Sequence, residues 1–583
     1  MEVPGKTDDG ARAALAGAAG IGLAAALALY LLVPELNQPV TFDGVHVFLP
    51  MARRLVEEGP RYFQDPDSVR MGPVAYGYPA LFGGREAAVR WANLVSFAAA
   101  VMLLGAAAWK AHSIRAGVAT AYLVAASPLL RRWVPDVMTE PPFIFLTALW
   151  LFSVGRLAAG GSRWWIALAG LAFALASLTR PAASLFAPVV CAWFALRAIY
   201  GRAGERRSDV HIAVAHLVAT LVWGSWLLHN AVSFGFPAIA GGAGNALWLG
   251  INPLTGGWDP LYFGLDYDDG AITGGLNPLS IGGDHLLGAA ARLELADTSL
   301  VQLLELVARK MVAFVFVPPV EVFAWRGWRL VFLTFSVATL WWNWRSRLVQ
   351  LAAAFALYML AVHMPVLFTV RYSIGALDVP LALLAGIGVA ECSTFRRARI
   401  MIPALMVVFA LGWFSFGPRL PQAPRLEHAY VEPRWHATGA ELSTRLTNAE
   451  WVSPGVMRLA KGAVIEIDVR DAPRLDKFEV TLATLDMTLA PTANGACSVM
   501  RLRYRAKSDA GYASWRKIGV PVVSDAAMHR YVVGTSVPLH VAEEGVLRMD
   551  FDCTAETVLT LGAIEVFGQT RGAIYRARLI PQG

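Results

Sequence analysis

Long apolar segments recur along most of this chain and constrain its fold more than any other feature. Each is close to the roughly 20 apolar residues that a helix needs to cross the hydrocarbon core of a bilayer. Only 16% of the residues are charged, against about a quarter in soluble domains. The pattern therefore predicts a multi-span α-helical membrane protein. The eleven clearest segments are 12–33, 88–108, 115–131, 141–158, 164–180, 182–200, 211–230, 329–344, 348–370, 373–392 and 400–417.

Two segments leave the number of spans open between about 11 and 13. The first apolar run, after Lys6 and Arg12, is too long for a signal-peptide core and has no convincing cleavage site, so it is expected to remain as a span. The run at 311–325 is short, and Pro318 and Pro319 would interrupt helical hydrogen bonding at its middle. If this run is re-entrant or interfacial, eleven spans remain; if it crosses the membrane, one more span is needed to keep the later basic clusters inside, which gives thirteen.

Basic residues in the short connections predict the orientation. Positively charged loops remain in the cytoplasm, so an odd number of spans places residues 34–87 and 231–306 in outer loops and exports the C-terminal part. The chain is then a multi-pass membrane protein with an extracytoplasmic C-terminal domain, which in a bacterial inner membrane is a periplasmic domain. This distribution also explains the net charge of +7, and no continuous basic and aromatic surface indicates nucleic-acid binding. The basic clusters are Lys110/Arg115, Arg156/Arg163, Arg197/Arg202/Arg206/Arg207, Arg345/Arg347 and Arg396/Arg397/Arg399.

The pattern changes after Gly417. Prolines at 418, 421 and 424 mark a linker, 418–424, between a membrane domain at 1–417 and a second domain at 425–583. Short alternating runs in the second domain predict strands of an all-β sandwich or jelly-roll-like domain, which we expect to bind or position a glycan acceptor. The clearest runs are Ala463–Val469, Phe478–Leu482, Ser498–Tyr504 and Val546–Phe551.

The four cysteines have no metal-ligand spacing such as C-x-x-C. Cys497 and Cys553 lie in or beside predicted strands, and an exported domain would be in an oxidising compartment. A disulfide between them stays open, because sequence does not show whether the two residues meet.

Two acidic loops follow apolar segments on the predicted outer side. Asp43 comes shortly after the first segment, followed by an amphipathic stretch at 47–56 suited to the membrane interface, and by Tyr76 and Tyr78. Asp136 and Glu140 are four residues apart, hence on one face if helical. An interfacial charge at 43 and a helix N-terminus with Pro141 at an early position are the ordinary interpretations.

Arginines and asparagines complete the predicted outer face. Arg180, and Arg371 with Tyr372, lie at the ends of apolar segments, where an arginine either extends towards the interface or holds a phosphate. The loop after 230 is rich in glycine and tryptophan and carries Asn230, Asn245 and Asn252, residue types suited to sugar hydroxyls.

Together these motifs resemble the GT-C superfamily of integral-membrane glycosyltransferases, of the bacterial aminoarabinose-transferase and protein-mannosyltransferase type. The resemblance covers about residues 12–417 and rests on Asp43, on Asp136-x-x-x-Glu140-Pro141, on Thr179-Arg180-Pro181, on the Gly-Asn-rich loop and on Arg371-Tyr372. Two positions depart from the pattern, since Gly44 stands where many relatives have a second acid, and His229 where an arginine is common.

The resemblance implies a polyprenyl-phosphate-linked sugar donor, a glycan, lipid or protein acceptor at the outer face, and an inverting transfer. Asp43 would be the base, Asp136 and Glu140 would position the acceptor or, with Asp43, a divalent cation (Mg²⁺, Mn²⁺ or Ca²⁺), and Arg180, Arg371 and Tyr372 would hold the donor phosphate. Tyr76, Tyr78, Asn230, Asn245 and Asn252 would line the sugar site. A lipid-linked sugar flippase and a membrane-anchored glycan-binding scaffold remain as alternatives. The sequence identifies neither sugar nor acceptor.

Overall fold

A computed structural model of the chain divides into two compact units. Unit 1 comprises residues 1–250, 279–284 and 298–422, and unit 2 comprises residues 251–278, 285–297 and 423–583. The structure describes residues 6–37, 40, 43–202, 204–251, 273, 276–316, 323–366, 370–392, 398–416, 433–441, 444–468, 481–491, 497–503, 517–522, 524–535 and 546–567.

A helix lies over each of the eleven apolar segments. These helices are α1 (Lys6–Leu32), α4 (Glu86–Ala111), α5 (Ile114–Ala126), α7 (Glu140–Ala158), α8 (Trp164–Thr179), α9 (Phe186–Tyr200), α10 (Arg206–Phe234), α15 (Phe323–Asn343), α16 (Arg347–His363), α17 (Val370–Cys392) and α18 (Ala398–Phe416). Among the described residues, six helical stretches are long and apolar enough to cross a membrane, and four more are apolar but shorter.

Shorter helices fill the connections. They are η1 (Val33–Asn37), η2 (Gly44–Phe48), α2 (Leu49–Glu58), η3 (Gly59–Gln64), η4 (Pro66–Arg70), α3 (Pro73–Ala80), α6 (Pro128–Arg131), η5 (Pro181–Ala183), α11 (Ala243–Ile251), α13 (Ile281–Asp297) and α14 (Leu300–Phe316). Helix α2 overlaps the amphipathic stretch predicted at 47–56. The ambiguous run at 311–325 divides between the end of α14 and the start of α15, and residues 317–322 lie outside the described part.

One predicted segment is interrupted. The apolar run at 115–131 forms α5 only as far as Ala126, and Ser127 then begins α6. Proline at 128 has no N–H for a continuing helix and fits the first helical position instead. The Ser127 hydroxyl accepts a hydrogen bond from the Leu130 N–H at 3.4 Å, which caps the new helix.

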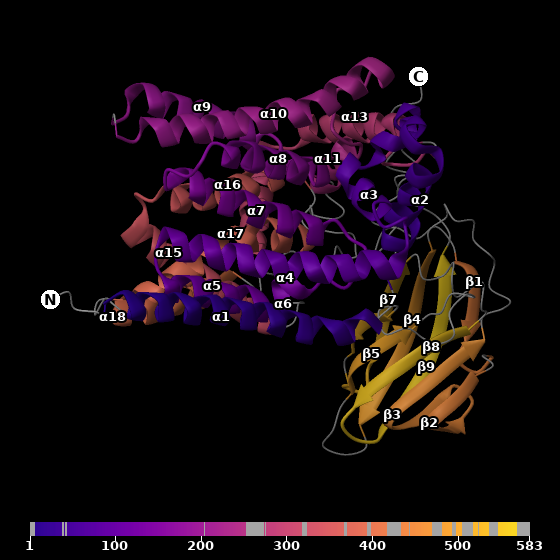
Figure 1. The fold of residues 1–583 in the computed structure, drawn as a ribbon. Coiled ribbons are helices and arrows are strands. Elements are labelled where there is room, and N and C mark those ends of the chain that lie inside the picture. The colour runs from indigo at the N-terminus through magenta and orange to yellow at the C-terminus, as the bar shows by residue number, and fades with distance from the viewer. Residues whose placement is uncertain are drawn as a thin grey trace. The chain divides into compact units, whose positions relative to one another are not determined.

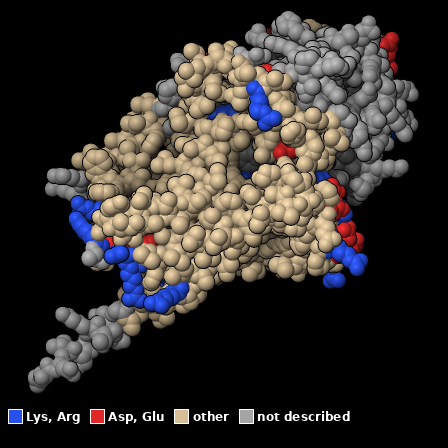
Figure 2. Space-filling model, turned by 90° about the horizontal axis from the view of Figure 1, so that it is seen from above, with Lys and Arg blue, Asp and Glu red and all other residues tan. Residues whose placement is uncertain are grey.

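The long helices of unit 1 run side by side (Figure 1). Helix α7 packs between α4 and α8, α10 packs on α8 and α9, and α17 packs on α5, α15 and α16. Figure 2 shows a broad uncharged surface on one face of this unit, with charged side chains gathered mainly towards the two ends. Helices that face lipid need such an uncharged band between charged ends. Unit 1 therefore has the surface of a multi-pass membrane protein.

In the described part of unit 2, the strands form one nine-stranded antiparallel sheet. The order is β6-β5-β8-β3-β9-β4-β7, with β1 on β9 and β2 on β3. The strands are β1 (Pro433–Thr438), β2 (Thr444–Ser453), β3 (Val456–Asp468), β4 (Thr481–Pro491), β5 (Cys497–Arg503), β6 (Lys517–Pro521), β7 (Met528–Thr535), β8 (Val546–Cys553) and β9 (Thr557–Phe567). The predicted fold class, a multi-span helical protein with a C-terminal all-β part, is confirmed.

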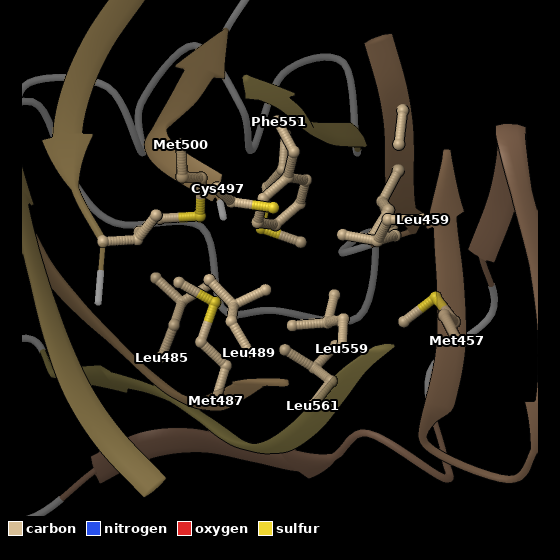
Figure 3. Close-up of a cluster of buried hydrophobic side chains, with 14 of the residues drawn as sticks. Met457, Leu459, Leu485, Met487, Leu489, Cys497, Met500, Phe551, Leu559 and Leu561 are labelled. Carbon is tan, nitrogen blue, oxygen red and sulfur yellow. The ribbon is translucent and has the colours of Figure 1, made fainter. Parts of the chain in front are cut away.

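The sheet encloses an apolar core. Side chains such as Leu459, Met487 and Leu559 point towards one another from different strands (Figure 3) and are fully buried. Strand β3 pairs with β9 over Val456–Leu459 and with β8 over Val464–Asp468, so one strand serves two neighbours on the same edge. Cys497 and Cys553 face each other on β5 and β8 and are joined in a disulfide.

Candidate functional site

Asp43 lies where the chain turns back after the first long helix. It precedes the π-helical turn η2 and is half-buried. The next residue, Gly44, lies close to the second acidic loop. A Cβ on Gly44 would lie 3.1 Å from the Val137 carbonyl oxygen and 3.3 Å from Val137 Cβ. A side chain at position 44 would also meet the Val40 side chain, and the close approach brings the first acidic loop against the second.

The second acidic loop is compact and buried. Asp136 is 8% exposed, and its Oδ1 accepts a hydrogen bond from the Val137 N–H at 2.7 Å. Helix α7 begins only at Glu140, with Thr139 at its N-cap and Pro141 in its first turn. Asp136 therefore precedes the helix, so the two acids do not share a helical face, and the alternative of a helix N-terminus with an early Pro141 describes this loop. Pro141 confines the helix start to the residues after the turn.

Glu140 and Arg180 form a buried pair. Arg180 Nη1 lies 3.5 Å from Glu140 Oε1, and both side chains are at most 9% exposed. The guanidinium also lies over the Phe143 ring, 5.6 Å from its centroid. Arg180 is the C-cap residue of α8 and has an extended backbone conformation. A carboxylate at the start of α7 therefore meets a guanidinium at the end of α8. Such an arginine does not extend to the interface; it is held in place.

Helix α17 lies against this pair. A Cβ on Gly375 would lie 2.9 Å from Arg180 Nη1 and 3.4 Å from Glu140 Cγ, so glycine permits the helix to approach the two charges. Arg371 lies one helical turn before Gly375 on the same helix. The side chains of Arg371 and Tyr372 are outside the described part of the structure, and their roles stay predictions.

The predicted aromatic residues of the first loop are structural anchors. Tyr76 is fully buried, and its hydroxyl donates to the Ser68 carbonyl at 3.0 Å. Its ring packs edge-on against Tyr62, with centroids 5.5 Å apart. Tyr78 lies 3.4 Å from Ser96 Oγ. Burial raises the pKa of both Tyr76 and Tyr78. These contacts fix the loop, and the predicted sugar contacts of both tyrosines stay predictions.

The third loop begins at the end of α10. Asn230 is buried, and its Nδ2 donates to the Ala238 carbonyl at 2.7 Å, which stabilises the turn after Gly235. Asn245 lies in the first turn of α11, where its N–H and that of Gly244 donate to Asp284 Oδ1 at 3.2 and 2.7 Å. The prediction at Asn252 lies outside the described residues.

Hydrogen bonds join the first loop, within 34–87, to the end of α10 and to the loop that follows it. His229 Nε2 is 3.0 Å from the Phe63 carbonyl, and the Gly241 N–H donates to the Val69 carbonyl at 2.6 Å. Position 229 therefore contacts the first loop through its ring. Gly72 packs against the end of α8, where a Cβ added to this glycine would lie 3.7 Å from the Thr179 carbonyl oxygen. Three connections distant in sequence thus converge beside Arg180.

The predicted cation site does not fit the geometry. Across the described residues, no group of three or more His, Cys, Asp or Glu side chains could hold a metal ion. Glu140 is also engaged by Arg180 and by the Thr139 hydroxyl, at 3.4 Å. An ion bound by Asp43, Asp136 and Glu140 together would have to displace the guanidinium.

Sequence reasoning missed two buried cations, Arg329 at the start of one apolar segment and Lys310 directly before another. Arg329 and Asp378 are fully buried and form a two-point ion pair at 2.8 Å between α15 and α17. Lys310 of α14 donates to the carbonyls of Gly250, Met364 at 3.1 Å and Val366 at 2.8 Å. Ionisable residues inside apolar segments are rare and functional by default, and this signal could have found them.

The fold and these contacts define a multi-pass membrane protein whose acidic loops and a paired arginine meet at one end of its helices. Residues 75–226 match the family model described as dolichyl-phosphate-mannose-protein mannosyltransferase. Over this segment the chain is similar to the protein-mannosyltransferase type named in the resemblance. The matched segment, 75–226, contains Asp136, Glu140 and Arg180 but neither Asp43 nor Arg371. No curated protein matches the chain.

Three solved structures to which the chain is similar are distant in sequence. The archaeal oligosaccharyltransferase AglB from Archaeoglobus fulgidus is 13% identical, with a TM-score of 0.41 over 69% of this chain and 55% of that one. ArnT from Cupriavidus metallidurans is 16% identical, with a TM-score of 0.29 over 64% and 77%. EmbB from Mycobacterium smegmatis is 12% identical, with a TM-score of 0.26 over 94% and 64%. The chain spans about half of AglB, and similarity at this level does not establish a shared activity.

Proposed function

We propose that the protein is a glycosyltransferase that moves a sugar from a polyprenyl-phosphate donor to an acceptor hydroxyl at the outer face of the membrane. The observation that carries this proposal is the buried Glu140–Arg180 pair beside the two acidic loops. The pair lies in the segment that matches the mannosyltransferase family model. A fixed arginine suits a phosphate that carries charge before and after the transfer.

Asp43 is the base in this proposal. Its carboxylate accepts the proton of the acceptor hydroxyl while that oxygen attacks the anomeric carbon. The bond from the anomeric carbon to the phosphate oxygen breaks on the opposite side, so the configuration inverts and free lipid phosphate leaves. The position supports the role, because Asp43 is half-buried and its loop touches the Asp136 loop through Gly44 and Val137.

The remaining residues position the reactants. Glu140 holds the Arg180 guanidinium, which stabilises the departing phosphate. Arg371, one turn from Gly375 on the helix that covers this pair, supplies a second positive charge, with Tyr372 beside it. Asp136, with one carboxylate oxygen held by the Val137 N–H, orients the acceptor. No step requires a metal ion.

The buried charges within the helices favour one other function. A lipid-linked sugar flippase would use ionisable residues inside the membrane, and the Arg329–Asp378 pair is of that kind. However, Arg329 Nη2 donates to Asp378 Oδ2 at 2.8 Å, and Arg329 Nη1 donates to the Phe314 and Val315 carbonyls at 2.6 and 3.2 Å. The contacts are those of a fixed structural pair, and we rank the transferase first.

Topology is part of the proposal. With the acidic loops outside, cysteines introduced at 65, 260 and 440 react with an impermeant thiol reagent in intact cells, whereas those at 204 and 397 react only after permeabilisation. The C-terminal domain is then outside, where it binds or positions a glycan acceptor. Labelling of position 397 in intact cells would contradict this orientation.

The proposal is tested with purified protein and a polyprenyl-phosphate sugar labelled in the sugar. A transferase releases free lipid phosphate in step with labelled acceptor product. A flippase moves the labelled lipid across vesicles and leaves it intact. A scaffold binds it without either outcome. Intact donor after prolonged incubation with a panel of glycan, lipid and peptide acceptors would reject the transferase.

A further inference from the structure

Two side chains near the start of α4 hold the loop that carries Asp136. Arg90 and Asn93 are three residues apart, so they share one face of the helix. Both are buried, at 7% and 0% exposure. Asn93 Nδ2 donates to the Asp136 carbonyl at 2.6 Å, and Arg90 Nε donates to the Pro135 carbonyl at 2.5 Å. Two consecutive carbonyls of the acidic loop are thus bound to one rigid helix.

Arg90 also reaches the other acidic loop. Its Nη2 donates to the Glu35 carbonyl at 3.3 Å, in the short helix that follows α1, and its Nη1 donates to Glu86 Oε1 at 3.1 Å. A guanidinium presents its donors in a fixed plane. One side chain therefore ties the start of the Asp43 loop to the Asp136 loop and is itself oriented by a carboxylate one turn earlier.

The loop supplies few of these bonds itself. Its N–H groups are used locally, from Val134 to the Arg131 carbonyl at 3.0 Å and from Asp136 to the Trp133 carbonyl at 3.3 Å. The carbonyls of Pro135 and Asp136 turn instead to α4. Buried carbonyls need donors, so removal of Arg90 or Asn93 releases the backbone on which Asp136 is mounted.

We infer that Arg90 and Asn93 (the α4 clamp) are positioning residues that set the separation of the two acidic loops for the transfer. The inference rests on the proposed function for its consequence, although the clamp itself is a matter of geometry. Neither residue touches the reacting groups in this account. Each acts through backbone carbonyls, and the Gly44–Val137 contact passes the position of one loop to the other.

The test combines turnover with hydrogen exchange on the full-length protein. In Arg90→Met and Asn93→Leu, kcat should fall about 100-fold, since displacement of a reacting group by about 1 Å costs that much. Binding of the labelled donor should be retained. Amides over 133–139 should exchange faster than in the wild type, while those of α7 and α8 keep their protection.

Conservative variants keep the test informative if those two fold poorly. Arg90→Lys retains the charge and reaches fewer carbonyls, so it should have an intermediate kcat. Asn93→Asp keeps the shape of the side chain and removes the N–H that donates to the Asp136 carbonyl. The matched control is Arg85→Met, which removes an exposed arginine at the start of the same helix and should behave as wild type.

The outcomes separate the clamp from the proposed function. Normal exchange over 133–139 in both Arg90→Met and Asn93→Leu overturns the clamp, whatever the turnover. Faster exchange with unchanged kcat overturns its role in positioning. If the wild type itself transfers no sugar, the proposed function fails, and faster exchange in the variants still supports the clamp as the element that fixes the loop.

Discussion

The acidic loops of unit 1 and the sheet of unit 2 are stabilised in opposite ways. The loops are located by polar side chains that bind backbone carbonyls, as Arg90 does at Pro135. The sheet is located by an apolar core with residues such as Met487 and Leu559 at its centre, closed by the Cys497–Cys553 disulfide (Figure 3). Lipid is as apolar as leucine, so burial alone cannot order a membrane helix bundle, and directional contacts do so. In water, burial is the main driving force.

This difference predicts where a substitution acts. In the loops, a polar substitution should move reacting groups and lower activity with a moderate loss of stability. In the sheet, a substitution should lower stability and leave the chemistry of unit 1 as it is. The following predictions test the two halves of the comparison, beginning with the largest expected change in free energy.

Cys553→Ser should destabilise unit 2 by about 4 kcal/mol, because the disulfide closes a loop with a sequence separation of 56 residues. Chemical denaturation of the full chain, followed by hydrogen exchange in the peptides of β5 and β8, measures this. Cys392→Ser is the matched control, since Cys392 is a free cysteine in α17. An unchanged unfolding midpoint for β5 and β8 would mean that the apolar core suffices.

Arg180→Met should destabilise unit 1 by about 3 kcal/mol, since removal of one partner leaves a buried charge behind. Donor binding should weaken as well. Glu140→Gln combined with Arg180→Met removes both charges and should recover most of the stability without recovery of binding. Thermal unfolding and donor titration of the three variants measure the two effects. Recovery of binding in the double variant would show that Arg180 serves structure alone.

Asp65, in the first loop, should make a small, pH-dependent contribution to the free energy of unfolding. Burial acts to raise the pKa of Asp65, but the Asp67 N–H and the Arg54 guanidinium outweigh it, and the pKa is lowered. A lowered pKa stabilises the fold above the ordinary value of about 4, and this stabilisation is lost as the pH falls through the folded value.

The contribution of Asp65 should be less than about 1 kcal/mol, because Arg54 and Asp65 are both about a third exposed. Asp65→Asn should remove it at pH 7 and flatten the change between pH 6 and pH 3. Thermal unfolding across this range measures the difference between variant and wild type. A variant that loses stability with acid as steeply as the wild type would assign the effect to another group.

Much of the helical fold could be predicted from sequence, because lipid imposes length and composition on each span. The same rule predicted a helix over 115–131 without the break at Ser127, since a proline inside an apolar run gives no sign of whether it bends a helix or begins a new one. In unit 2 the alternating runs predicted strands. The neighbours of β9, which are β1, β3 and β4, could not be predicted, because they depend on contacts distant in sequence.

The candidate site, like the fold, could be predicted from sequence only in part. Asp136, Glu140 and Arg180 stood out because polar residues flank apolar segments there. The pairing of Glu140 with Arg180 depends on how α7 packs on α8, which no local pattern contains. Arg90 and Asn93 lie inside a predicted span, where their polarity was the available signal. Tyr76 and Asn230 were predicted to contact sugar, and this stays a prediction; their bonds to the Ser68 and Ala238 carbonyls depend on how the loops fold, which the sequence did not show.

The central claim is that Asp43 is the base of a sugar transfer, and Asp43→Asn tests it most directly. The change keeps the size of the side chain and removes its proton affinity. The measurement is release of free lipid phosphate from a labelled polyprenyl-phosphate sugar, with Asp67→Asn, an exposed acid of the same loop, as the matched control. The account predicts a loss of about 100-fold or more for Asp43→Asn, with donor binding retained and the control unchanged. Near-normal transfer by folded Asp43→Asn protein would contradict it.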